Sequence, residues 1–124
     1  MKVLGIVFLG GGLGSMVRFA MGKWVSSFHQ HPFPLGTLLA NITACFAIGL
    51  VIGFADHREA LTPNGRLFWA VGFCGGFSTF SAFTHETLNL VQNGNGTYGL
   101  LYVGASLVLC AAATFLGLFL SKGL

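Results

Sequence analysis

The stretch GFCGGFSTFSAFTHE, residues 72–86, decides the fold. It lies largely within an uncharged run, residues 67–85, yet it places a glycine pair (Gly75-Gly76) and two hydroxyl side chains (Ser78-Thr79) near the middle of that run. Glycine and hydroxyl residues weaken a helix, and broken backbone at membrane depth survives only when it is buried in protein or lines a cavity. The sequence therefore predicts a membrane-spanning helix that is broken at mid-span. A continuous helix that uses its glycines for packing is the alternative.

The composition of the whole chain places this stretch in a membrane protein. Of 124 residues, 54% are hydrophobic and 7% are charged, whereas a soluble domain is about 25% charged. Six basic and three acidic side chains cannot provide a water-soluble surface for a chain of this size. The composition excludes a soluble enzyme, a nucleic-acid-binding domain and a disordered tail. We expect an all-α integral membrane protein.

The charged residues divide the chain into long uncharged runs. A hydrocarbon core about 30 Å thick requires roughly 20 residues of helix, and turn-forming segments rich in Pro, Asn and Gly separate the runs. We therefore predict one membrane domain, residues 1–124, with four transmembrane helices. Their expected bounds are about 2–22, 35–55, 66–91 and 97–120.

The basic residues are divided almost evenly between the two sides of such a chain. With a cytoplasmic N-terminus, Arg18 and Lys23 lie toward the far side, and four others lie on the cytoplasmic side: Lys2, Arg58, Arg66 and Lys122. Four against two is a weak positive-inside bias. A chain with this balance can insert in both orientations.

Two polar side chains inside the predicted spans require an explanation. Arg18 in or near the bilayer costs several kcal/mol unless it reaches water or a partner, so it either snorkels to the interface or lines an anion vestibule. Asn41 lies about two turns into the second span, where its amide either bonds another helix or donates into an ion pathway. The residues leave both alternatives open.

Phenylalanines recur at helical spacing in the third span, at Phe73, Phe77, Phe80 and Phe83. Such a stripe normally packs a core, but the positive edges of aromatic rings can also hold a small, poorly hydrated anion.

The fourth span has a polar line at i+4 spacing, which either faces the third helix or bonds its own backbone. Its members are Tyr102, Ser106, Cys110 and Thr114. The three cysteines, Cys45, Cys74 and Cys110, have no CxxC spacing, and we interpret them as small apolar packing residues.

Three motifs in chain order resemble one known family. They are GGGLGSMVRF (residues 10–19), GTLLAN (36–41) and GFCGGFSTFSAF (72–83), the last followed by Glu86. Together they resemble the small bacterial fluoride channels of the Fluc, or CrcB, family, and the resemblance covers essentially the whole chain. It implies a fluoride-selective anion channel, not an enzyme, that gives passive fluoride efflux and protects the cell from fluoride toxicity. It also implies a multi-pass protein of the bacterial cytoplasmic (inner) membrane, assembled as an antiparallel, dual-topology homodimer that binds no nucleic acid.

The resemblance also assigns roles to single residues. The expected fluoride pathway comprises Asn41, the ring edges of Phe80 and Phe83, the Ser81 hydroxyl, Arg18 in the vestibule, Glu86, and Tyr102 and Ser106 on the last helix. The backbone carbonyls of Gly75 and Ser78 match those that hold a structural Na⁺ ion at the dimer centre. The family usually has TTFSTF where this chain has STFSAF, so Ser78 and Ala82 replace two threonines.

Two other functions must be weighed against a channel. A small dual-topology proton-coupled cation or drug antiporter needs a carboxylate in its first span, but residues 3–22 contain no Asp or Glu, which leaves Glu86 as the proton carrier. A membrane enzyme would have to use His85 and Glu86, without a Ser/His/Asp set or metal-ligand spacing to support it.

Overall fold

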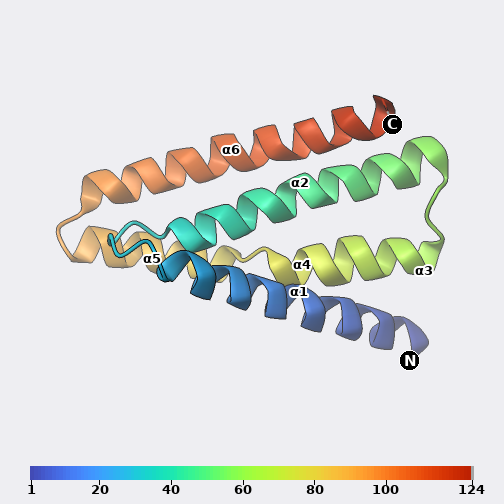
Figure 1. Ribbon diagram of the computed structural model, residues 1–124, viewed down its shortest axis with the longest axis horizontal. Coiled ribbons are helices and arrows are strands. Elements are labelled where there is room, and N and C mark those ends of the chain that lie inside the picture. The colour runs from blue at the N-terminus through green and yellow to red at the C-terminus, as the bar shows by residue number, and fades with distance from the viewer. Residues whose placement is uncertain (124) are drawn as a thin grey trace.

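The computed structural model describes residues 1–123, so that Leu124 alone of the expected domain lies outside it. Four long rods of helix lie side by side (Figure 1). In chain order the elements are α1 (Lys2–Ser26), α2 (Leu35–Arg58), α3 (Pro63–Arg66), the π-helical segment η1 (Leu67–Cys74), α4 (Gly75–Phe77), α5 (Phe80–Gln92) and α6 (Gly96–Gly123). All four rods are long and apolar enough to cross a bilayer, which confirms the prediction of an all-α protein with four spans.

The third rod, Pro63–Gln92, is built from several elements and is interrupted, as predicted. The Thr62 hydroxyl accepts the Gly65 N–H at 3.0 Å and caps the N-terminus of α3, where Pro63 occupies the first turn. The rod continues through η1 and α4 to Phe77. Ser78 and Thr79 then adopt extended backbone conformations before α5 begins. The interruption separates two half-helices of one membrane span.

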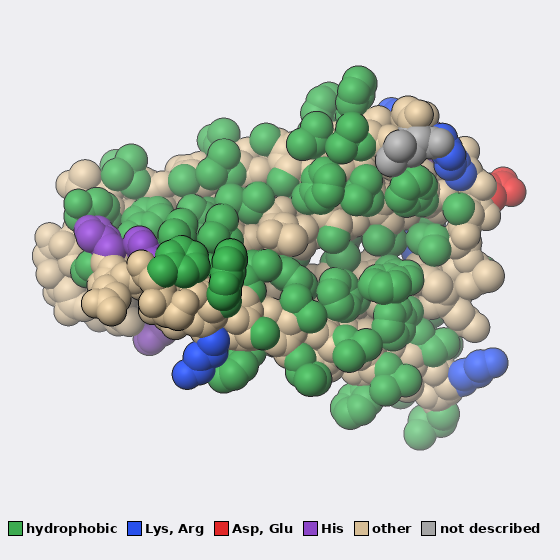
Figure 2. All heavy atoms as spheres, viewed as in Figure 1, with side chains coloured by type: hydrophobic (Ala, Val, Ile, Leu, Met, Phe, Trp, Pro, Cys, Tyr) green, Lys and Arg blue, Asp and Glu red, His purple; other side chains and the backbone are tan. Residues whose placement is uncertain are grey.

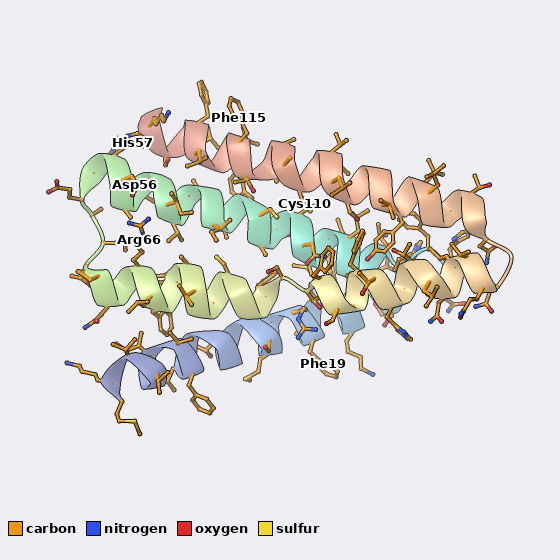
Figure 3. The ribbon with its side chains drawn as sticks, turned by 180° about the vertical axis from the view of Figure 1, so that it is seen from behind. Phe19, Asp56, His57, Arg66, Cys110 and Phe115 are labelled. Carbon is orange, nitrogen blue, oxygen red and sulfur yellow. The ribbon has the colours of Figure 1, made fainter. Side chains whose placement is uncertain are left out.

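The rods alternate in direction, so the N- and C-termini lie at the same end (Figure 1). Blue side chains gather at this end in the space-filling view (Figure 2). On the same end, Asp56 and Arg66 form an exposed ion pair at 3.3 Å (Figure 3). The charged loop between α2 and α3 is therefore an aqueous end of the molecule.

Glycines set the distance between α1 and the third rod. A Cβ on Gly10 would lie 3.0 Å from the Phe73 nitrogen and 3.1 Å from the Gly72 Cα. A Cβ on Gly14 would collide with the Phe73 carbonyl and lie 2.8 Å from the Phe77 nitrogen. Small residues permit this close approach of backbones in membranes, which explains the glycine-rich start of the first span.

Helices α2 and α6 pack against each other through a second set of small residues. They run in the same direction (Figure 1), and Gly49 lies against Gly117, since a Cβ on Gly49 would be 3.1 Å from the Gly117 Cα. One turn later, Gly53 faces Ser121, which is fully buried. These contacts fix the register of the two helices along their length.

The packing of α1 gives a testable difference between two glycines of the same helix. Gly14→Ala places a methyl group against the backbone of the third rod and should destabilise the fold by about 1–3 kcal/mol, the usual cost of overpacking. Gly12 has open space around its Cα, so Gly12→Ala should be neutral or raise stability by about 1 kcal/mol through helix propensity. Thermal unfolding of both variants in detergent tests this; equal melting temperatures would contradict the packing.

Candidate functional site: the break in the third span

Asn41 of α2 binds the backbone at Thr79, where the third rod is interrupted. Its side-chain oxygen accepts the Thr79 N–H at 2.7 Å, and its Nδ2 donates to the Thr79 carbonyl at 3.1 Å. The same residue thus satisfies a donor and an acceptor that a continuous helix would have satisfied internally. The sequence left two roles open for Asn41, and the structure places its amide in an interhelical hydrogen-bonded pair.

The break leaves two carbonyls without the donor that they would have in a continuous helix. The Thr79 N–H would normally reach the Gly75 carbonyl, but it bonds Asn41. The Ala82 N–H would normally reach the Ser78 carbonyl, but it bonds the Thr79 hydroxyl at 3.2 Å. The carbonyls of Gly75 and Ser78 therefore lose their usual helical partners.

Arg18 binds the end of the first half-helix. Its Nε donates to the Gly76 carbonyl at 3.2 Å, and the Ser15 hydroxyl reaches the same oxygen at 3.5 Å. A positive charge at the C-terminal end of a helix is favourable because carbonyl dipoles point toward it. Arg18 thus has a protein partner within the span.

Glu86, in the middle of α5, joins three helices. One carboxylate oxygen accepts the Thr37 hydroxyl at 2.7 Å, and the other accepts the Tyr102 hydroxyl at 2.9 Å. Tyr102 has no exposed surface. Charge-assisted bonds of this kind are stronger than neutral ones, so Glu86 holds α2, α5 and α6 together.

One cavity of about 280 Å³ lies beside the break. It gathers residues of α2, the break, α5 and α6: Asn41, Cys45, Ser78, Thr79, Phe80, Phe83, Ser106, Leu107 and Cys110. The Ser106 hydroxyl is buried and has no hydrogen-bond partner within the described part of the chain. A buried hydroxyl without a partner on a cavity wall is available to a ligand.

A second cavity of about 350 Å³ lies on the other side of Thr79. Its wall carries the charged side chains of Arg18, Lys23 and Glu86, together with Thr37. Thr79 lines both cavities, and Asn41, which binds Thr79, lines the first. The hydrogen-bonded Asn41–Thr79 pair therefore lies where a charged cavity and an aromatic cavity meet.

The phenylalanine stripe has two different environments. Phe77 is buried against Ala40 and Ala44, with Phe73 beside it, and this half of the stripe is core packing. Phe80 and Phe83 line the aromatic cavity with ring centroids 5.5 Å apart. Phe80 is 74% exposed, so that its ring is open to a ligand or to another chain.

Two other residues predicted for the fluoride pathway, Ser81 and Tyr102, do not line the two cavities. The Ser81 hydroxyl lies 3.3 Å from the Thr79 hydroxyl, but Ser81 is exposed and is not among the residues that line either cavity. Tyr102 contributes through Glu86 rather than as a cavity wall. The sequence indicated the Thr79 hydroxyl only as a group that weakens a helix and did not indicate the hydrogen bonds that Thr79 makes. Thr37, whose hydroxyl is a polar group within the second span, was not predicted to contribute.

Within residues 1–123, no group of three or more His, Cys, Asp or Glu side chains is placed to hold a metal ion.

The fold and the site define a class: a multi-pass membrane protein with a polar, aromatic-lined break at mid-span. The sequence profile described as "CrcB-like protein, Camphor Resistance (CrcB)" matches residues 5–118. The chain belongs to this CrcB family.

Several relatives match over nearly the full chain. A "Fluoride-specific ion channel FluC" of Flavobacterium psychrophilum is 37% identical over 124 residues, which is 100% of both chains. Proteins of the same name from Acidobacterium capsulatum and Gloeothece citriformis are 41% and 42% identical, over 90% and 94% of both chains. The family resemblance predicted from the three motifs is thereby confirmed.

The two bonds between Asn41 and Thr79 predict that Asn41 is needed for the fold. Asn41→Leu leaves a backbone N–H and a carbonyl unpaired at membrane depth, and each costs about 1–3 kcal/mol. The melting temperature in detergent should fall clearly. Asn89→Leu is the matched control, because Asn89 is exposed on α5 and its side chain, which lies 3.4 Å from His85 Nε2, bonds no backbone group among the described residues. A variant Asn41→Leu that is as stable as Asn89→Leu would contradict this role.

Proposed function

We propose that the chain is a fluoride-selective channel that allows passive fluoride efflux. The observation that carries the proposal is the broken third span, where the Asn41–Thr79 pair separates the charged cavity from the aromatic cavity. Family membership and the shared name of the relatives support the same function. These relatives are named ion channels, which accords with the expectation that the chain is not an enzyme. Neither finding supports the antiporter alternative.

The chemistry of the two cavities suits a small anion whose hydration water is replaced before it reaches the aromatic rings. Arg18 and Lys23 attract an anion into the charged cavity. Asn41 has two amide N–H groups and uses one on Thr79, so the other can replace a water of hydration. Phe80 and Phe83 offer ring edges in the next cavity, followed by the unpartnered hydroxyl of Ser106.

The proposed mechanism needs no energy source beyond existing gradients. Hydrogen fluoride enters a cell as a neutral acid and dissociates in a more alkaline cytoplasm. A negative-inside membrane potential then drives the anion outward through an open pathway. We place the protein in the bacterial cytoplasmic membrane, where this potential exists.

We further propose that two copies assemble as an antiparallel dimer around a Na⁺ ion. The weak charge bias permits insertion in both orientations. The Gly75 and Ser78 carbonyls lack their helical donors, and carbonyls of unwound membrane helices are suitable ligands for Na⁺. Two carbonyls from each chain would complete the site.

The direct test of channel function is efflux from liposomes loaded with fluoride or with chloride. We expect fast fluoride release and little chloride release, measured with ion-selective electrodes. Equal release of both ions, or release of neither, would refute the proposal. Proton-coupled cation uptake without a fluoride leak would instead establish the antiporter.

Substitutions in the aromatic cavity should reduce fluoride flux without breaking up the proposed dimer. Phe80→Ile removes a ring edge, and Asn41→Asp replaces the free amide donor by an acceptor; each should lower fluoride efflux at least tenfold. Phe115→Ile is the matched control, since Phe115 is 71% exposed and points away from the other helices (Figure 3). Unchanged flux in both cavity variants would refute the site assignment.

The dimer and its ion have a separate test. Light scattering of the detergent-solubilised protein should give the mass of two chains, and replacing sodium by N-methylglucamine should lower the melting temperature. A monomeric mass would refute the dimer. A melting temperature that is independent of sodium would refute the ion site.

A further inference from the structure

The proposed channel function assigns no role to two of the three cysteines. Cys45 of α2 and Cys110 of α6 both line the aromatic cavity, and neither is fully buried. Cys74 of η1 is 3% exposed and is not among the residues that line this cavity.

The register of α2 and α6 places Cys45 beside the turn of α6 that begins at Cys110. The helices run in the same direction (Figure 1), and Gly49 lies against Thr114 and Gly117. One turn earlier, four residues before each of these positions, Cys45 faces the turn of α6 that begins at Cys110. Cys110 lies on the side of α6 toward α2 (Figure 3). The pairing of the thiols therefore follows from backbone packing as well as from the cavity wall.

The polar surroundings of the pair favour a bound species. The Ser106 hydroxyl lies one turn before Cys110 on α6 and lines the same cavity. Ser106 is 6% exposed, and its oxygen has no partner among the described residues. Two thiols and a free hydroxyl thus converge on one space.

We propose that Cys45 and Cys110 form a two-coordinate site for a soft dication such as Hg²⁺. The bound ion obstructs the cavity. Thiolates select soft metals, whereas the four ligands of a zinc site are absent within residues 1–123. Each thiol loses one proton to water and forms one S–Hg bond. The product is neutral, because two thiolates balance a dication, and a neutral complex avoids the cost of burying charge in the membrane.

The binding test uses mercuric acetate and the full-length protein in detergent. Native mass spectrometry should show one Hg²⁺ per chain, with the loss of two protons. N-ethylmaleimide labelling of the unmodified sequence, followed by peptide mapping, should then show Cys45 and Cys110 protected together by Hg²⁺ at one equivalent. Protection of only one of them, or of a pair that includes Cys74, would overturn the proposal without recourse to any variant.

Competition with glutathione separates two-thiol from one-thiol binding. Stripping Hg²⁺ from the unmodified protein should require at least 100-fold more glutathione than stripping it from Cys45→Ser or Cys110→Ser. Cys74→Ser is the matched control and should hold Hg²⁺ as tightly as the unmodified protein. Equal retention by all four proteins would overturn the site.

Obstruction of the cavity rests on the proposed channel function and has its own readout. Hg²⁺ should lower fluoride efflux at least tenfold relative to the same protein without metal, and the ratio should approach one in Cys45→Ser and in Cys110→Ser. Persistent inhibition in both variants would overturn the obstruction. A protein that shows no fluoride efflux before metal is added would refute the channel instead, and the mass and labelling results would still decide the binding site.

Discussion

The hydrocarbon of a membrane cannot hydrogen-bond a free backbone group, and the structure meets this constraint through Asn41. Its amide takes both the N–H and the carbonyl of Thr79, so that the third span can be interrupted without unpaired groups at that residue. The Thr79 hydroxyl then caps the next half-helix by accepting the Ala82 N–H. The break is therefore part of the folded structure, and α2 stabilises it through Asn41.

The rest of the site is arranged around the two ends created by this break. Arg18 binds a carbonyl of the first half-helix, and Glu86 ties the second half-helix to α2 and α6. The glycine contacts of α1 and of α2 with α6 bring the helices close enough for these bonds. The charged cavity lies among α1, α2 and α5, and α1 supplies its Arg18 and Lys23. The aromatic cavity lies among α2, α5 and α6, and Phe80 and Phe83 of α5 line it.

Sequence was sufficient for features that depend on local composition. Charge spacing predicts four spans, and the glycines and hydroxyls of residues 75–79 predict the interruption; the structure has both. The sequence could not predict the contacts between helices. The hydrogen bonds between Asn41 and Thr79 could be identified only from the fold, which places α2 beside the break. Cys45 and Cys110 were interpreted as packing residues, because nothing in their sequence spacing indicates that they line one cavity.

The most direct test of this account is hydrogen exchange at the Thr79 amide, measured by NMR in lipid nanodiscs. If Asn41 binds that amide, Thr79 should exchange as slowly as the helical amides on either side, and Asn41→Leu should accelerate its exchange selectively. An amide at Thr79 that exchanges as fast in the unmodified protein as the exposed loop amide of Gln30 would contradict the account.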